Sequence, residues 1–166
     1  MELHINKLTA HEAAEAFNRC CGSKEWVTRM LAKRPFPSID SIFESAKEIW
    51  WQLDRKDWLE AFSHHPKIGD LDSLKKKFAG TADLAASEQA SVNAAREETL
   101  QALAKGNKEY EDKFGYIFIV CATGKSPEEM LSLLQSRLPN NDADEIKIAA
   151  EEQSKITRLR LERICQ

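Results

Sequence analysis

The hydrophobic positions of this chain recur almost throughout at the three- and four-residue spacing of an amphipathic helix. The clearest stripe follows Ser38 and contains Ile39, Ile42, Phe43, Ala46, Ile49, Trp50 and Leu53. Three more helices are predicted in the first 65 residues: one from the Thr9–Glu12 capping box to Gly22, one over 24–33 before a proline turn, and one from Asp54. The last of these must end at or before His65, because a residue that precedes proline is disfavoured in the helical region.

The second half of the chain is also predicted to be helical. The expected segments are a short basic helix over 71–78, a long helix over 83–105 that stops at Gly106-Asn107, one turn over 110–113, a helix over 127–138 and a last helix over 142–164. The β-branched and aromatic run 116–122 is either helical or extended. We therefore expect an all-α fold, a single compact multi-helix domain over 1–166 with about eight helices.

The amino-acid composition limits the kinds of binding partner and the cellular compartment that we expect for this protein. There are 24 Lys and Arg against 27 Asp and Glu, so the formal net charge is −3, and a nucleic-acid partner is not expected. The four cysteines lack the two-residue spacing of zinc or thioredoxin motifs, which favours a reducing, cytoplasmic setting. No leader segment is recognisable, and no apolar run approaches the roughly 18 residues of a membrane span.

Two charged residues interrupt the predicted apolar faces of the two longest helices. Glu88 lies four residues before Val92 on the long helix, and Arg160 lies four residues after Ile156 on the last helix, whose inner face also includes Gln153. A buried charge without a partner is very costly. Glu88 and Arg160 therefore either form a structural salt bridge, with each other or with neighbours, or bind a ligand.

His65 is the third candidate, because it stands at a helix boundary and imidazole titrates near neutral pH. The simpler alternative is that its ring caps the helix end.

A metal site would use His64, His65, Asp70 and Asp72, but adjacent histidines rarely reach one ion, so we expect no metal. We also expect no cofactor, because the glycines have no phosphate-loop spacing. Cys121, in its apolar run, is expected to be an inert thiol rather than a nucleophile.

Histidine, glutamate and arginine together suit a particular chemistry. An arginine presents a planar fork to carboxylate or carbonyl oxygens, a carboxylate accepts hydrogen bonds or tunes an imidazole, and the imidazole moves a proton. This combination fits carbanion or enolate chemistry on a small polar anion.

Several motifs then point to one family. In chain order they are Arg34-Pro35-Phe36, His65-Pro66, Ile68-Gly69, Ser87-Glu88-Gln89, the run from Phe114 to Ala122, and the run from Lys155 to Leu161. With these motifs the chain resembles 2-oxo-4-hydroxy-4-carboxy-5-ureidoimidazoline (OHCU) decarboxylases of urate breakdown, from about Leu8 to Ile164. The resemblance implies an all-helical, cofactor-free carboxy-lyase, usually a homodimer, that converts the anionic substrate OHCU to (S)-allantoin and carbon dioxide.

The resemblance also implies site residues, position by position. The family's catalytic residues fall on His65, Glu88 and Arg160. Substrate contacts are expected from Pro66, Ser87, Gln89, Phe118, Ile119, Val120, Cys121 and Ala122. One departure is Ala85, where relatives often carry a serine, so that Ser87 or Ser91 would have to replace its hydrogen bond.

Two alternatives from other functional classes stay open. A non-catalytic helical binding module would keep the fold but not require His65 for its function. A metal-dependent hydrolase using His64 and His65 would lose activity to chelators and regain it with zinc or manganese.

Overall fold

The structure is a computed structural model that describes residues 2–67, 70–78 and 86–165, and for 86–95 it describes the backbone course alone. Within these ranges the chain forms nine helices and no strand, which confirms the all-α class. Its internal contacts divide it into two compact units, Met1–His65 with Ile148–Gln166, and Pro66–Lys147. Each unit is described by itself below, and the single domain over 1–166 stays a prediction.

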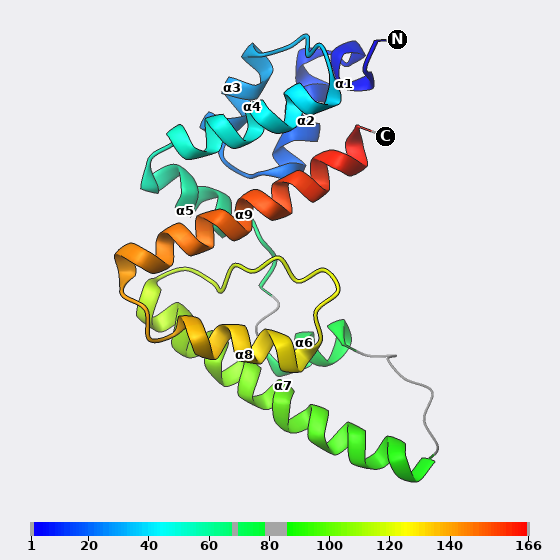
Figure 1. The fold of residues 1–166 in the computed structure, drawn as a ribbon, viewed down its shortest axis with the longest axis vertical. Helices are drawn as coiled ribbons and strands as arrows, with labels where there is room; N and C mark the ends of the chain where they lie inside the picture. Colours follow the sequence, from blue (N-terminus) through cyan, green and yellow to red (C-terminus); the bar gives the residue numbers. More distant parts are fainter. Residues whose placement is uncertain (1, 68–69, 79–85, 166) are drawn as a thin grey trace. The chain divides into compact units, whose positions relative to one another are not determined.

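The first unit contains five N-terminal helices and the C-terminal part of the last helix (Figure 1). These are α1 (His4–Lys7), α2 (Ala10–Cys20), α3 (Lys24–Ala32), α4 (Ile39–Gln52), α5 (Arg55–Ser63) and α9 (Asp142–Ile164). The Thr9–Glu12 capping box opens α2, and the Ser38 hydroxyl accepts from the Ser41 amide at the start of α4. The predicted helices are confirmed here, whereas the short α1 was not predicted.

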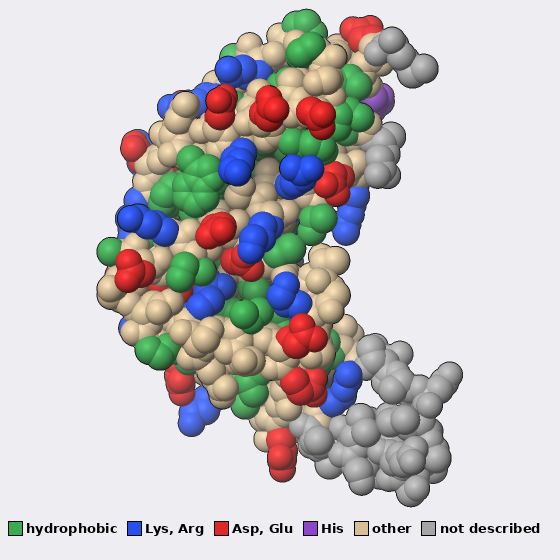
Figure 2. All heavy atoms as spheres, viewed as in Figure 1, with side chains coloured by type: hydrophobic (Ala, Val, Ile, Leu, Met, Phe, Trp, Pro, Cys, Tyr) green, Lys and Arg blue, Asp and Glu red, His purple; other side chains and the backbone are tan. Residues whose placement is uncertain are grey.

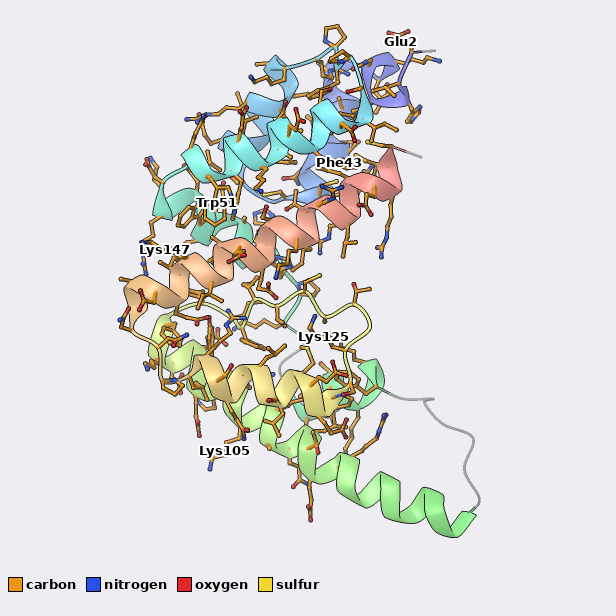
Figure 3. The ribbon with its side chains drawn as sticks, viewed as in Figure 1. Glu2, Phe43, Trp51, Lys105, Lys125 and Lys147 are labelled. Carbon is orange, nitrogen blue, oxygen red and sulfur yellow. The ribbon has the colours of Figure 1, made fainter. Side chains whose placement is uncertain are left out.

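Buried aromatic rings connect the helices of this unit. Trp26 on α3 is fully buried and donates through its indole N–H to the Ala46 carbonyl of α4 at 3.2 Å. Trp50 on α4 donates to the Ala150 carbonyl of α9 at 2.8 Å. Two large hydrophobic side chains, Ile39 and Trp51, remain 40% exposed on α4, and Trp51 is labelled in Figure 3. The indole hydrogen bonds thus fix the position of α4 against both α3 and α9.

The second unit contains α6 (Leu71–Lys77), α7 (Ala86–Phe114), α8 (Pro127–Arg137) and the first turns of α9. Its longest element, α7, packs along α8 (Figure 1). As predicted, α8 starts after a Ser126 cap, whose hydroxyl accepts from the Glu129 amide at 3.1 Å, with proline at its first position.

The predicted stop of the long helix at Gly106-Asn107 is wrong. The helix continues to Phe114 and absorbs the separate turn expected over 110–113. A Cβ at Gly106 would lie 2.6 Å from Cδ2 of Leu134, a fully buried residue of α8. This glycine therefore allows two helices to approach closely and does not end the first one.

Two surface properties bear on possible partners. Figure 2 shows Lys and Arg interspersed with Asp and Glu over the face in view, so that face is not a continuous basic surface. None of the described helices is both long and apolar enough to cross a membrane.

Candidate active site

His65 lies just beyond α5, as the proline rule predicted. The helix ends at Ser63, and the His65 amide still donates to the Phe62 carbonyl at 3.3 Å. The preceding ring, that of His64, packs so closely on Gly22 that any Cβ at that glycine would overlap it. The missing side chain of Gly22 therefore leaves room for the His64 ring against the α2–α3 turn.

The imidazole of His65 is directed to α9. Its Nε2 forms a short hydrogen bond with Oε1 of Gln153, whose Nε2 donates to Oγ1 of Thr157 at 3.1 Å. Gln153 and Thr157 are buried, with 1% and 5% of their surface exposed. The alternative that His65 caps its own helix is therefore wrong, since the ring bonds a distant glutamine instead.

Burial lowers the pKa of His65 below its ordinary value, and the nearby Arg160 and His64 lower it further. The hydrogen bond to Gln153 acts in the opposite direction but does not prevail. The ring is therefore mainly neutral at neutral pH, so that it can accept a proton.

Arg160 lies half-buried at the margin of the α9 inner face, not at its centre. Its Nη1 makes long contacts with the last carbonyls of α2, 3.4 Å to Arg19 and 3.5 Å to Cys20. Within the described side chains it pairs with no carboxylate. A guanidinium with five N–H donors and two weak contacts keeps donors for an anion.

The cysteines and acidic residues do not form a second reactive centre in the described part of the chain. Burial raises the pKa values of Cys20 and Cys21 to about 12, so both stay thiols at neutral pH. No group of three or more His, Cys, Asp and Glu among the described residues is arranged to hold a metal ion.

Residues 117–122 belong to the second unit and form neither helix nor strand, so the helical alternative left open by the sequence is wrong for them. Two cations hold their carbonyl groups: Arg137 donates to Ile119 at 2.7 Å, and Lys125, labelled in Figure 3, donates to Cys121 at 2.8 Å. The Val120 amide donates to no partner within the described residues. An ordered segment with a free amide of this kind can bind an anionic oxygen.

The Arg137 guanidinium is itself held by a buried cluster. Its Nε donates to Glu145 Oε2 at 2.8 Å, and Tyr110 and Asn140 donate to the same carboxylate. Glu145 is fully buried, and the guanidinium also lies 4.5 Å from the ring centre of Phe118. The cluster therefore fixes both the backbone and one side chain of the 117–122 segment.

The predicted site residues can now be placed. His65 and Arg160 both belong to the first unit, where Arg160 lowers the pKa of His65. Pro66 begins the second unit and is exposed, and Phe118–Ala122 lie in that unit. The side chains of Ser87, Glu88 and Gln89 lie outside the described residues, as do those of Ala85 and Ser91.

Two buried side chains that bond predicted site residues were not themselves predicted. Gln153 was assigned to the inner face of α9 but not to His65, and its polarity at a buried position was the available signal. Arg137 was not singled out, because its partners at positions 110, 119 and 145 come from separate elements.

An all-helical chain with a neutral histidine beside an arginine is a candidate for acid–base chemistry on an anion, and comparison with known proteins supplies its family. The sequence model described as OHCU decarboxylase matches residues 6–162. The chain belongs to the OHCU decarboxylase family.

Named relatives agree with this assignment. The chain is 42% identical over 149 residues to the uric acid degradation bifunctional protein TTL of Arabidopsis thaliana, covering 87% of this chain and 45% of that protein. It is 26% identical over 158 residues to a Haloferax volcanii OHCU decarboxylase, covering 95% and 91% of the two chains. The chain thus spans less than half of the bifunctional protein and nearly all of the archaeal one.

Solved structures show the same fold. An OHCU decarboxylase crystallised in the presence of (S)-allantoin matches with a TM-score of 0.71 and 37% identity, over 90% of this chain and 96% of that chain. An (S)-allantoin synthase matches with a TM-score of 0.68 at 19% identity, over 96% of this chain and 52% of that chain, and supports the fold alone.

Proposed function

We propose that this chain decarboxylates OHCU to (S)-allantoin and carbon dioxide in urate breakdown. The observation that carries the proposal is the neutral, half-buried His65 beside the available guanidinium of Arg160, in a chain of the OHCU decarboxylase family. An acid–base group near a cation suits the removal of a carboxylate from a small anion.

The reaction divides into steps that these groups can support. The bond from the ring to the carboxylate breaks and carbon dioxide leaves, while the electron pair forms a C=C bond to the ureido-bearing carbon. The pair of the former C=N bond moves to the ring nitrogen, which takes up a proton from solvent. The substrate hydroxyl then loses its proton to become a carbonyl, and the ureido-bearing carbon gains a proton on one face. We assign charge stabilisation to Arg160 and the Val120 amide, and proton transfer at the hydroxyl to His65.

The other predicted site residues keep supporting roles in this proposal. Glu88 would tune or assist His65, while Pro66, Ser87, Gln89 and the segment Phe118–Ala122 would contact the substrate. The protein would use neither metal nor cofactor, because the ring of the substrate itself accepts the electron pair.

The test is optical. OHCU is generated freshly from urate with the two preceding enzymes, and circular dichroism follows the appearance of chiral allantoin. We expect rapid formation of the S enantiomer with the parent chain, and loss of about 10²–10⁴-fold in rate with His65→Ala, the usual contribution of a general acid or base. His11→Ala is the matched control, since His11 is an exposed histidine of the same unit.

Other outcomes would select the remaining alternatives. Equal rates for parent and His65→Ala would overturn the histidine assignment. A slow racemic background from both proteins would favour a binding module, whereas activity that chelators abolish and zinc or manganese restores would favour a metal-dependent hydrolase.

We further propose that the protein is a cytoplasmic homodimer. None of the four cysteines, all of which are described, forms a disulfide, which suits a reducing compartment, and the resemblance to OHCU decarboxylases implies a homodimer. Light scattering during size-exclusion chromatography should give about twice the 18.9 kDa chain mass, and a monomer mass would contradict the proposal.

A further inference from the structure

A buried run of hydrogen bonds connects the candidate acid–base residue to the interior of α9. His65 Nε2 meets Gln153 Oε1, Gln153 Nε2 donates to Thr157, and Thr157 also forms a side-chain hydrogen bond with Cys21. Gln153 and Thr157 are four residues apart and therefore lie on one face of the helix. All four residues belong to the first unit.

The orientation of the Gln153 amide indicates where the His65 proton lies. In the structure Gln153 Oε1 faces the imidazole, and the Gln153 amide nitrogen donates to Thr157. A carbonyl oxygen only accepts hydrogen bonds, so the neutral ring must carry its proton on Nε2. Its other nitrogen, Nδ1, then carries the lone pair, and within the described residues Nδ1 has no hydrogen-bond partner.

We infer that Gln153 is a positioning residue that holds neutral His65 as the Nε2–H tautomer and leaves Nδ1 as the nitrogen that exchanges a proton with the substrate. The inference deepens the proposed function and rests on it for the identity of the reaction. Its statement about the tautomer concerns the unliganded protein and can be tested without any substrate.

The burial of Gln153 explains why its amide can fix the tautomer of His65. Gln153 is 1% exposed, so water cannot replace a lost partner of its amide, and breaking either bond leaves a buried polar group unsatisfied. The alternative tautomer would place the Nε2 lone pair against the Gln153 carbonyl oxygen, which is repulsive. The glutamine therefore fixes both the proton and the ring orientation, as a second group does for many functional histidines.

The direct measurement is long-range ¹H–¹⁵N NMR on protein labelled at its four histidines, with His65→Gln used to assign the His65 ring. Above the pKa of His65 we expect the shifts of a protonated Nε2 and an unprotonated Nδ1. The shifts of an Nδ1–H tautomer, or of rapid exchange between the two tautomers, would overturn the inference.

Variants of Gln153 test whether the tautomer of His65 affects the rate of decarboxylation. In Gln153→Leu, which has no acceptor, kcat should fall about 10- to 100-fold while KM changes less than about threefold, because proton transfer rather than binding is affected. Gln153→Glu keeps an acceptor and adds a negative charge, so it should recover most of kcat above neutral pH. That charge favours the imidazolium, so the acid limb of kcat/KM should move up by about one pH unit.

The control is Gln135→Glu, the same change at an exposed position in the last turn of α8. It should leave both kcat and the pH profile unchanged. A Gln153→Glu profile that overlays the parent, or a Gln153→Leu variant with parental kcat, would show that Gln153 has a structural role only.

The two proposals fail in different ways. If His65 holds the Nε2–H tautomer but the protein has no decarboxylase activity, the positioning role of Gln153 stands and the proposed reaction is wrong. If the protein is active and requires His65, but the ring holds the Nδ1–H tautomer, the proposed reaction stands and the role of Gln153 is wrong.

Discussion

Neighbouring residues of the same type have different chemistry in this protein, because burial and partners differ at each. His64 is exposed and packs against Gly22, whereas His65 is half-buried, bonds Gln153 and lies within the field of Arg160. Burial and a nearby cation both disfavour the imidazolium. The proton affinity that suits His65 to the proposed proton transfer is thus a property of its surroundings in the first unit.

The lowered pKa of His65 predicts a pH-dependent stability. Between the folded-state pKa and about 6.5, the usual value for the unfolded chain, the unfolded state binds more protons than the folded state. The His65 contribution to the free energy of unfolding should therefore be complete above pH 6.5 and diminish as pH falls through this window. Its slope cannot exceed about 1.4 kcal/mol per pH unit, the value for one proton.

Urea unfolding at pH 7.5 and at lower pH measures this effect. His65→Gln should show a smaller loss of stability on acidification than the parent chain. The exposed His11, whose side chain is 84% exposed, provides the comparison through His11→Gln. Equal acid losses for the parent and His65→Gln would contradict the prediction.

At the scale of elements, local signals were readable from the sequence and long-range contacts were not. The Ser126 cap and the ends of α9 depend on residues within one turn, so the predictions for α8 and α9 were confirmed. Gly106 was misread, because whether a glycine stops a helix or permits a close contact depends on a partner helix. For the same reason the inner face of α9 revealed Gln153 as a buried polar residue but did not reveal its partner.

The close approach of α7 and α8 predicts the effect of Gly106→Ala. In an open helix this change stabilises by about 0.5–1 kcal/mol. Here the new methyl group would meet Leu134 Cδ2 at 2.6 Å, and Leu134 is fully buried, so overpacking costs about 1–3 kcal/mol. We expect a net destabilisation, measured by urea unfolding.

Two further variants check this explanation. Gln101→Ala, at an exposed position of α7, should have little effect. Leu134→Ala alone leaves a cavity, and adding Gly106→Ala to it should cost less than it does in the parent chain. Additive effects of the two changes would mean that the methyl group does not meet Leu134.

At the scale of the whole molecule, each unit contains a buried polar network among its described residues. Gln153 holds the His65 ring in the first unit, and the Arg137–Glu145 cluster holds residues 117–122 in the second. Buried networks of this kind require every member to be satisfied, because water cannot compensate for a missing one.

The second network yields a prediction for Arg137→Met. Removing the guanidinium leaves Glu145, which is fully buried, without its cation and frees the Ile119 carbonyl, so the free energy of unfolding should fall by about 3–5 kcal/mol. Arg137→Met combined with Glu145→Leu removes the uncompensated charge and should recover much of that loss. Urea unfolding of the two single variants and the double variant completes the cycle.

The kinetics of the double variant then separate stability from positioning. It should regain stability without regaining activity, because no side chain at position 137 then holds the Ile119 carbonyl and the 117–122 segment is less ordered. Since that segment is proposed to bind the substrate, KM for OHCU should rise more than kcat falls. A double variant with parental stability and parental KM would show that the cluster stabilises the second unit without positioning the substrate-binding segment.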